Sequence, residues 1–236
     1  MTSAGARSLP TLEVTEVGGA VVVVDVIRAF TTAAAAFEAG AEAVDLVGTV
    51  EEALALKAAH PGWWAMGEDR GLRPDGFDLP NSPVLAATAD LAGRTLVQST
   101  SAGTQGVVAA QRAERLWCTG LATASATARA VNAAGLGAPT YVITGWLPDR
   151  PDRPGTDDLL TARHIEAIRT GAAGPDAHDQ VARAVAASDE AARTLQLGSG
   201  HVHPDDIAFA ADVDRAGFAM EVRRDDTGLR LERTAA

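Results

Sequence analysis

Acidic, basic and hydroxyl side chains gather at one point of the chain, directly after an apolar run. Asp25 and Arg28 follow the valines at 21–24, and Thr31 and Thr32 come next. A carboxylate can hold a hard cation or act as a nucleophile, and arginine and a helix N-terminus can bind an anion. The group therefore suits an anion-binding site. The alternative is a plain surface ion pair between Asp25 and Arg28, which are three residues apart.

Two further polar segments follow apolar runs in the same way. Residues 67–83 form a long loop rich in glycine, proline and charge, with Glu68 and Arg70 near its start. Loops of this length are usually functional or disordered; Phe77 favours an ordered one, and the alternative is a solvated connection. Residues 99–104, STSAGT, could form a phosphate-sized cradle at a helix N-terminus or an ordinary capped turn.

These segments need a scaffold, and apolar strand-like runs alternate with alanine-rich helical ones along the chain. The predicted strands cover 21–24, 43–46, 64–66, 95–98, 115–118 and 140–144. The predicted helices cover 32–39, 51–59, 106–112, 122–133, 157–170 and 176–194, with short ones near 86 and at 207–212. This alternation predicts an α/β fold, a three-layer α/β/α arrangement with a mostly parallel or mixed sheet. Such sheets bind ligands outside the carboxyl ends of their strands, so the three polar segments are expected at one edge.

The end of the chain and the domain organisation complete this prediction. Residues 219–223 and 228–233 are expected to pair as an antiparallel hairpin at the edge of the sheet. No linker or repeat divides the sequence, so one domain over 1–236 is expected, with residues 1–15 flexible.

Composition narrows the class of function. The formal charge of −11 argues against nucleic-acid binding, which needs a basic footprint. The single cysteine, Cys118, is interpreted as a core residue rather than a nucleophile. No signal peptide or apolar run long enough to span a membrane is found, so we expect a cytoplasmic protein with a small-molecule ligand and no membrane partner. A homo-oligomer is one expectation for the assembly.

Three blocks of the sequence carry a known family pattern in the same order and spacing. Residues 25–32, DVIRAFTT, match the pattern DVLRATST, and residues 100–104, TSAGT, match TTNGT. Residues 67–71 and 76–83, GEDRG and GFDLPNSP, match GERGG and GFDxGNSP. By these blocks the chain resembles the ComB-type 2-phosphosulfolactate phosphatases, magnesium-dependent enzymes associated with coenzyme M biosynthesis.

The resemblance implies a ComB-like fold and a Mg²⁺-dependent phosphoric monoester hydrolase. The expected substrate is a small acidic phosphoester, 2-phosphosulfolactate, which is cleaved to sulfolactate and phosphate. The implied metal ligands are Asp25, Glu68 and Asp158, because Mg²⁺ prefers oxygen ligands. The implied catalytic residues are Asp25, Arg28, Glu68 and Arg70, and Arg73 is expected to help hold the anionic groups. The implied substrate-binding residues are Thr31, Thr32, Asn81, Ser82, Ser101, Gly103 and Thr104.

Departures from the family pattern leave other functions open. Ala102 replaces an asparagine, and Asp157-Asp158 with Arg163 stand where the family has Glu-Asp followed by small residues. A related phosphatase with a different substrate, or a non-catalytic anion-binding protein on the same scaffold, are the alternatives. Asp25 could instead be a nucleophile, although the segment lacks the Asp-Xaa-Asp signature of aspartyl-phosphate chemistry.

Two acidic segments have structural alternatives. Residues 201–206, HVHPDD, could ligate a transition metal, but they more simply start a helix, with proline and acids in its first turn. Asp157 and Asp158 could likewise only fill the first turn of a helix capped by Thr156.

Overall fold

One continuous ten-stranded sheet organises the protein in the computed structural model, which describes residues 5–150, 152–225 and 228–235. Its first half-sheet consists of four parallel strands in the order β1 (Arg7–Pro10), β8 (Thr140–Ile143), β2 (Ala20–Val24) and β7 (Arg115–Thr119). Its second half-sheet consists of β3 (Ala43–Leu46), β6 (Thr95–Ser99), β4 (Trp64–Gly67) and β5 (Leu79–Pro80), also parallel to one another. The predicted α/β fold with a mostly parallel, mixed sheet is confirmed.

The C-terminal hairpin joins the two half-sheets. Strands β9 (Phe218–Asp225) and β10 (Gly228–Ala235) pair antiparallel, and β9 also pairs with β7 while β10 pairs with β3. The hairpin was expected, but its place at the edge of the sheet was wrong: it lies in the middle. Its three antiparallel ladders make the half-sheets run in opposite directions along the sheet.

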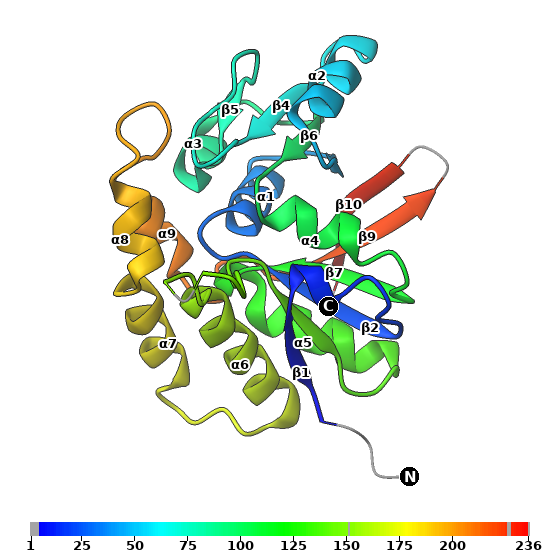
Figure 1. Ribbon diagram of the computed structural model, residues 1–236, viewed down its shortest axis with the longest axis vertical. Coiled ribbons are helices and arrows are strands. Elements are labelled where there is room, and N and C mark those ends of the chain that lie inside the picture. Colours follow the sequence, from blue (N-terminus) through cyan, green and yellow to red (C-terminus); the bar gives the residue numbers. More distant parts are fainter. Residues whose placement is uncertain (1–4, 151, 226–227, 236) are drawn as a thin grey trace.

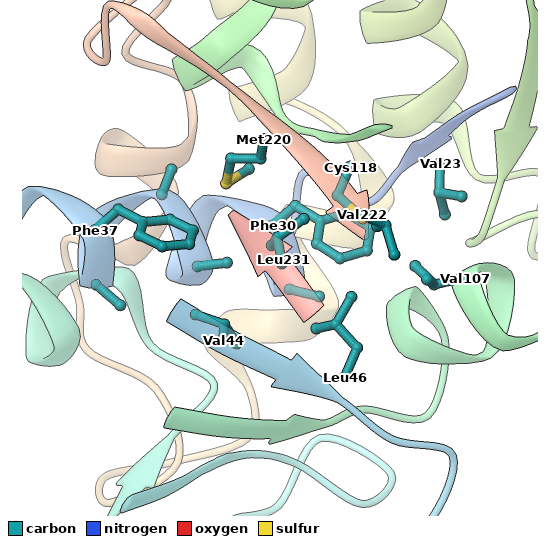
Figure 2. Close-up of a cluster of buried hydrophobic side chains, with 14 of the residues drawn as sticks. Val23, Phe30, Phe37, Val44, Leu46, Val107, Cys118, Met220, Val222 and Leu231 are labelled. Carbon is teal, nitrogen blue, oxygen red and sulfur yellow. The ribbon is translucent and has the colours of Figure 1, made fainter. Parts of the chain in front are cut away.

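The sheet curls around two of its helices. Helices α1 (Ala29–Glu38) and α4 (Gly103–Ala109) lie between the half-sheets (Figure 1), where their side chains share one buried cluster with both. Figure 2 shows Phe30 and Phe37 of α1 among apolar side chains of β3, β7, β9 and β10. Alanines fill most other positions of α1, which lets the strands approach it closely.

The remaining helices cover the outer faces. Helices α5 (Ala124–Ala134) and α6 (Thr156–Thr170) pack on the first half-sheet, and α7 (Ala177–Ala186) packs on α6. Together with α9 (Asp206–Ala210) they form a second apolar cluster with this half-sheet. Helix α2 (Val50–Ala59) packs on the second half-sheet, and α3 (Pro83–Thr88) packs on α1. Because β2 has apolar neighbours on both faces, its run of valines is buried throughout. None of the described helices is long and apolar enough to cross a membrane.

Several element boundaries differ from the predicted ones. The helix predicted over 176–194 is two helices, because Ser188 accepts a hydrogen bond from the Ala191 N–H (3.2 Å) and starts α8 (Asp189–Leu195). Strand β1 and the 3₁₀ helix at Thr11–Glu13 occupy much of the segment expected to be flexible, of which residues 1–4 lie outside the described part. A second 3₁₀ helix covers Leu121–Thr123 and leads into α5.

Candidate active site

Asp25 lies at the carboxyl end of β2, where the buried strand meets α1. Its Oδ1 accepts the N–H of Ala29 (2.9 Å) at the start of α1, and its Oδ2 lies 3.2 Å from the hydroxyl of Thr144. The residue is only 6% exposed. Asp25 therefore occupies the helix N-terminus at which an external anion was expected.

Thr144 connects Asp25 to a second buried carboxylate. Its hydroxyl lies 3.2 Å from Asp158 Oδ2 and 3.0 Å from the carbonyl of Val24, so three acceptors surround one proton. Asp158, in the first turn of α6, also accepts the N–H groups of Val26 (2.9 Å) and Gly145 (2.8 Å). These bonds hold the two carboxylates side by side without a basic partner for either among the described residues.

The carboxyl groups of this cluster are difficult to ionise. Burial, with the nearby charge of Glu68, raises the pKa of Asp25 to about 6. Burial, with the charges of Glu190 and Asp25, raises the pKa of Asp157 to about 8, and burial also raises that of Asp158 well above its usual range. Asp157 is 2% exposed, and its Oδ1 has no hydrogen-bond partner among the described residues. Such a cluster would be stabilised by a cation.

The oxygen-only donor set fits Mg²⁺, which needs few carboxylates because it keeps several waters. Asp25 and Asp158 are the adjacent pair. The expected third ligand is not assembled with them: within the described ranges, no three acidic, histidine or cysteine side chains are close enough to hold a metal by themselves. Glu68 lines the same cleft as Asp25 and Asp158, so the expected set of these three carboxylates stays a prediction.

Glu68 instead ties two loops together. Its carboxylate accepts the N–H groups of Ser101 (2.6 Å) and Gly71, and the hydroxyl of Ser101 (3.1 Å). Thr100 and Thr104 exchange hydrogen bonds of 3.0 Å with each other. The turn before α4 is therefore a capped turn in which the N–H groups of Thr100, Ser101 and Thr104 donate within the protein, and the phosphate cradle stays a prediction.

The buried carboxylates open into a cleft of about 870 Å³. Asp25, Asp157 and Asp158 lie in its wall together with five arginines, which are Arg28, Arg70, Arg150, Arg153 and Arg193. Neutralising acids accompany some of these cations, but the cleft is rich in groups that bind anions although the protein as a whole is acidic.

Arg28 is buried and is not part of a surface pair with Asp25. It is 3% exposed, and its Nη1 donates to Asp206 Oδ2 and to the carbonyl of His201, both at 2.9 Å. Asp206 also accepts from the hydroxyl of Ser82 (2.7 Å). The surface ion-pair alternative is wrong, and Arg28 connects the cleft to the start of α9.

The expected substrate-binding residues divide into two groups. Asn81 and Ser101 line the cleft, and Asn81 Oδ1 is buried with no partner among the described residues. The others are buried in the structure behind the wall, where Thr31 bonds the carbonyl of Val26 (2.7 Å) and Gly103 packs against Asp25. Thr31, Thr32, Ser82, Gly103 and Thr104 do not line the cleft in this structure, and their expected contacts with a ligand stay predictions.

Other sequence expectations also change. Arg73 lies in a neighbouring cavity of about 630 Å³ that shares Glu68, Arg70 and Ser101 with the cleft. Arg163 is exposed on α6 and does not line the cleft, whereas Ala102 does. Cys118 is fully buried, and burial raises the pKa of its thiol, so its interpretation as a core residue is confirmed.

The segment 201–206 starts a helix. His203 N–H donates to Asp206 Oδ2 (3.0 Å) at the beginning of α9, while His201 Nδ1 accepts the N–H of Arg73 (2.9 Å). The transition-metal alternative finds no support, since the described residues contain no such ligand cluster.

Sequence reasoning missed part of the cleft wall. Thr144 and the loop carrying Arg150 and Arg153 directly follow strand β8, and Arg193 lies on α8. Thr144 and this loop show the same pattern as the segments that the sequence analysis identified, because polar residues follow an apolar strand. Arg193 has no local signal, because only the packing of α8 brings it to the cleft.

Comparisons with known proteins bear on this arrangement. A family model described as 2-phosphosulpholactate phosphatase matches residues 8–222. A protein of Bacillus subtilis named "Probable 2-phosphosulfolactate phosphatase" is 33% identical over 212 residues, 90% of each chain. A protein of Thermus thermophilus with the same name is 43% identical over 143 residues, 60% of this chain and 58% of that protein.

Proposed function

Because the chain belongs to the 2-phosphosulfolactate phosphatase family, it is a phosphoric monoester hydrolase, and we propose that its cleft hydrolyses a small acidic phosphoester with the help of Mg²⁺. The expected substrate is 2-phosphosulfolactate. One observation carries the proposal: the wall of one cleft joins several arginines to buried carboxylates that form no ion pair with a described residue. That combination suits a substrate with more than one negative charge and a cation beside it.

In the reaction, the oxygen of a water molecule attacks phosphorus and the bond between phosphorus and the substrate oxygen breaks. The leaving oxygen takes up a proton, so the products are a hydroxy acid and phosphate. When bound, Mg²⁺ supplies positive charge that polarises the phosphoryl group. Asp25 and Asp158 are the residues that would hold it, and their bonds to Ala29, Val26 and Gly145 fix their positions.

The other residues bind and orient. Arg70 and the part of Arg28 that faces the cleft would stabilise charge on the phosphoryl oxygens. Glu68 would position Arg70 indirectly. Its carboxylate accepts the backbone N–H of Ser101, and the hydroxyl of Ser101 accepts the backbone N–H of Arg70 at 2.7 Å. In this proposal Asp25, Arg28 and Arg70 keep the roles expected from the sequence, and Glu68 is a positioning residue.

A substrate panel tests this function. We would measure kcat/KM with Mg²⁺ for 2-phosphosulfolactate, 2-phospholactate and isopropyl phosphate, which is phospholactate with a methyl group in place of the carboxylate. The acidic esters should be favoured over isopropyl phosphate by about ten- to hundredfold, the scale of one charge-assisted hydrogen bond. Equal values for all three would contradict anion recognition, and a preference for phospholactate would change only the substrate.

The same panel separates an enzyme from a binding protein. A non-catalytic anion-binding protein would bind the esters in calorimetry and release no phosphate. Multiple turnovers of any of the three esters would exclude that alternative.

A further inference from the structure

The arginines of the cleft differ in how far protein acids neutralise them. Arg150 donates through two nitrogens to the two oxygens of Asp152, each at 3.0 Å. Arg28 pairs with the buried Asp206, and Arg193 lies 3.1 Å from Glu190. These three guanidinium groups already have a carboxylate at hydrogen-bonding distance, so an incoming anion would have to compete for them.

Arg70 and Arg153 remain available for an anion. Arg70 forms no ion pair with a described residue. The Nε of Arg153 is buried without a hydrogen-bond partner in the described part of the chain, and its nearest acid, Asp152, is 3.9 Å away and already held by Arg150. An unpaired buried donor beside a cleft is costly unless a ligand satisfies it.

The two available arginines come from opposite sides of the fold. Arg70 follows β4 of the second half-sheet, whereas Arg153 lies on the loop after β8 of the first. The backbone of Arg153 is held in place, since its carbonyl accepts the Leu147 N–H (2.9 Å) and its N–H donates to Arg150 (2.8 Å). A bridge between Trp146 and Pro154 closes the base of this loop. The guanidinium of Arg153 thus extends from a backbone position that these bonds fix.

We propose that Arg153 determines substrate specificity by binding the second acidic group of the substrate, a carboxylate or sulfonate, while Arg70 binds the phosphoryl group. This inference rests on the proposed function and deepens it by naming the residue that recognises the anionic organic part of the phosphoester. The substrate spans the cleft between the half-sheets, with one charged end at each available arginine. The covalent skeleton of the substrate holds its two anionic groups apart, so two separate cations can each contact one of them.

The test compares Arg153→Gln with Arg163→Gln, because both changes remove one positive charge and Arg163 is exposed outside the cleft. The readout is the ratio of kcat/KM for 2-phospholactate to that for isopropyl phosphate. In Arg153→Gln this ratio should fall by about ten- to hundredfold, mainly through KM for phospholactate. In Arg163→Gln it should stay within about twofold of the wild-type ratio.

Further variants make the result decisive. Arg70→Gln should reduce kcat/KM for both esters, because both carry the phosphoryl group. Arg153→Lys should recover part of the ratio, since it restores the charge without the planar fork. An unchanged ratio in Arg153→Gln, or an equal loss for both esters, would overturn the assignment. Thermal melting of each variant checks that the fold is retained.

Binding separates this inference from the proposed function. If the wild-type protein hydrolyses none of the three esters of the panel, the proposed function fails, and the comparison of phospholactate with isopropyl phosphate is made with dissociation constants from calorimetry. Arg153→Gln should then weaken phospholactate binding selectively. Equal dissociation constants for the two esters in the wild type would contradict the role of Arg153.

Discussion

Thr144 illustrates how individual residues prepare the cleft for a cation. It has one hydroxyl proton, and the carbonyl of Val24 and the carboxylates of Asp25 and Asp158 lie around it. At most one of these acceptors can receive the proton at a time, so the negative charge remains largely unneutralised. The carboxylates of Asp25 and Asp158 therefore repel each other. Either protonation of these acids or binding of Mg²⁺ reduces that repulsion, so protons and Mg²⁺ compete for the same oxygens.

Asp25→Asn tests the importance of charge at the end of β2. The change keeps the shape of the side chain but removes a proposed ligand, so kcat should fall by about a hundredfold or more while the melting temperature stays the same or rises. Steady-state phosphate release and thermal melting measure the two effects. Asp90→Asn, at an exposed position, is the matched control. Turnover of Asp25→Asn within about tenfold of the wild type would remove Asp25 from the catalytic residues.

Asp157 should make the metal-free protein less stable as the pH rises. Its pKa is raised from 3.8 to about 8, so between these values the folded chain keeps a proton that the unfolded chain releases. Rising pH therefore favours unfolding across this window. Asp157→Asn imitates the neutral form and should add on the order of 2 kcal/mol to the free energy of unfolding at pH 8, with little change near pH 4.

Denaturant unfolding in EDTA at several pH values measures this difference between Asp157→Asn and the wild type. The gap between the two proteins should widen steadily from pH 4 to pH 8. A gap that is independent of pH would show that Asp157 does not hold a raised pKa in the folded chain.

At the scale of elements, the site depends on the close approach of two helix starts to one strand end. Gly103, the first residue of α4, has so little space that a Cβ there would lie 2.6 Å from Ala29 Cβ and 2.8 Å from Asp25 Oδ2. Gly106, one turn later, packs as tightly on Val23 of β2. These glycines bring the segment after β6 to the end of β2, so they place the two half-sheets around one cleft.

Gly103→Ala should disturb this approach. The new methyl group forces α4 away from Asp25, which should cost about 1–3 kcal/mol of stability and reduce kcat because Asp25 is displaced. Chemical denaturation and phosphate release measure both effects. Gly18→Ala is the control, since a Cβ there would meet its nearest heavy atom only at 3.8 Å. Wild-type stability and activity in Gly103→Ala would contradict the packing argument.

The sequence predicts most of the strands and helices, but it does not predict which strands pair with one another. Apolar runs identify β2, β3, β4, β6 and β7. Polar residues after β2 and β4 identify Asp25 and Glu68 as part of the cleft wall. Local pattern does not show which strands pair, so the hairpin was placed at an edge. Its position depends on contacts far apart in sequence, such as the ion pair of Arg230 with Asp45 (2.7 Å) across β10 and β3. The position of Arg193 in the cleft wall was hidden for the same reason.

At the scale of the whole molecule, the curled sheet explains how strand ends from opposed half-sheets reach one cleft. Successive strands rotate by roughly 20–25°, so the rotation accumulated from β2 across the central hairpin to β6 turns the ends of these strands toward each other. Helices α1 and α4 fill the space inside the curl (Figure 1). The cleft therefore lies between the two half-sheets. Segments attached to the first half-sheet contribute Asp25, Asp158 and Arg153, and segments attached to the second contribute Glu68 and Arg70.

The central claim is that this cleft hydrolyses an acidic phosphoester with a divalent cation held by its buried carboxylates. The most direct measurement is the rate of phosphate release from 2-phosphosulfolactate by the purified protein, first with excess EDTA and then after Mg²⁺ is added back. We expect release to stop in EDTA and to return with Mg²⁺, because the carboxylates of Asp25 and Asp158 would otherwise repel the substrate. An undiminished rate in EDTA would contradict the account.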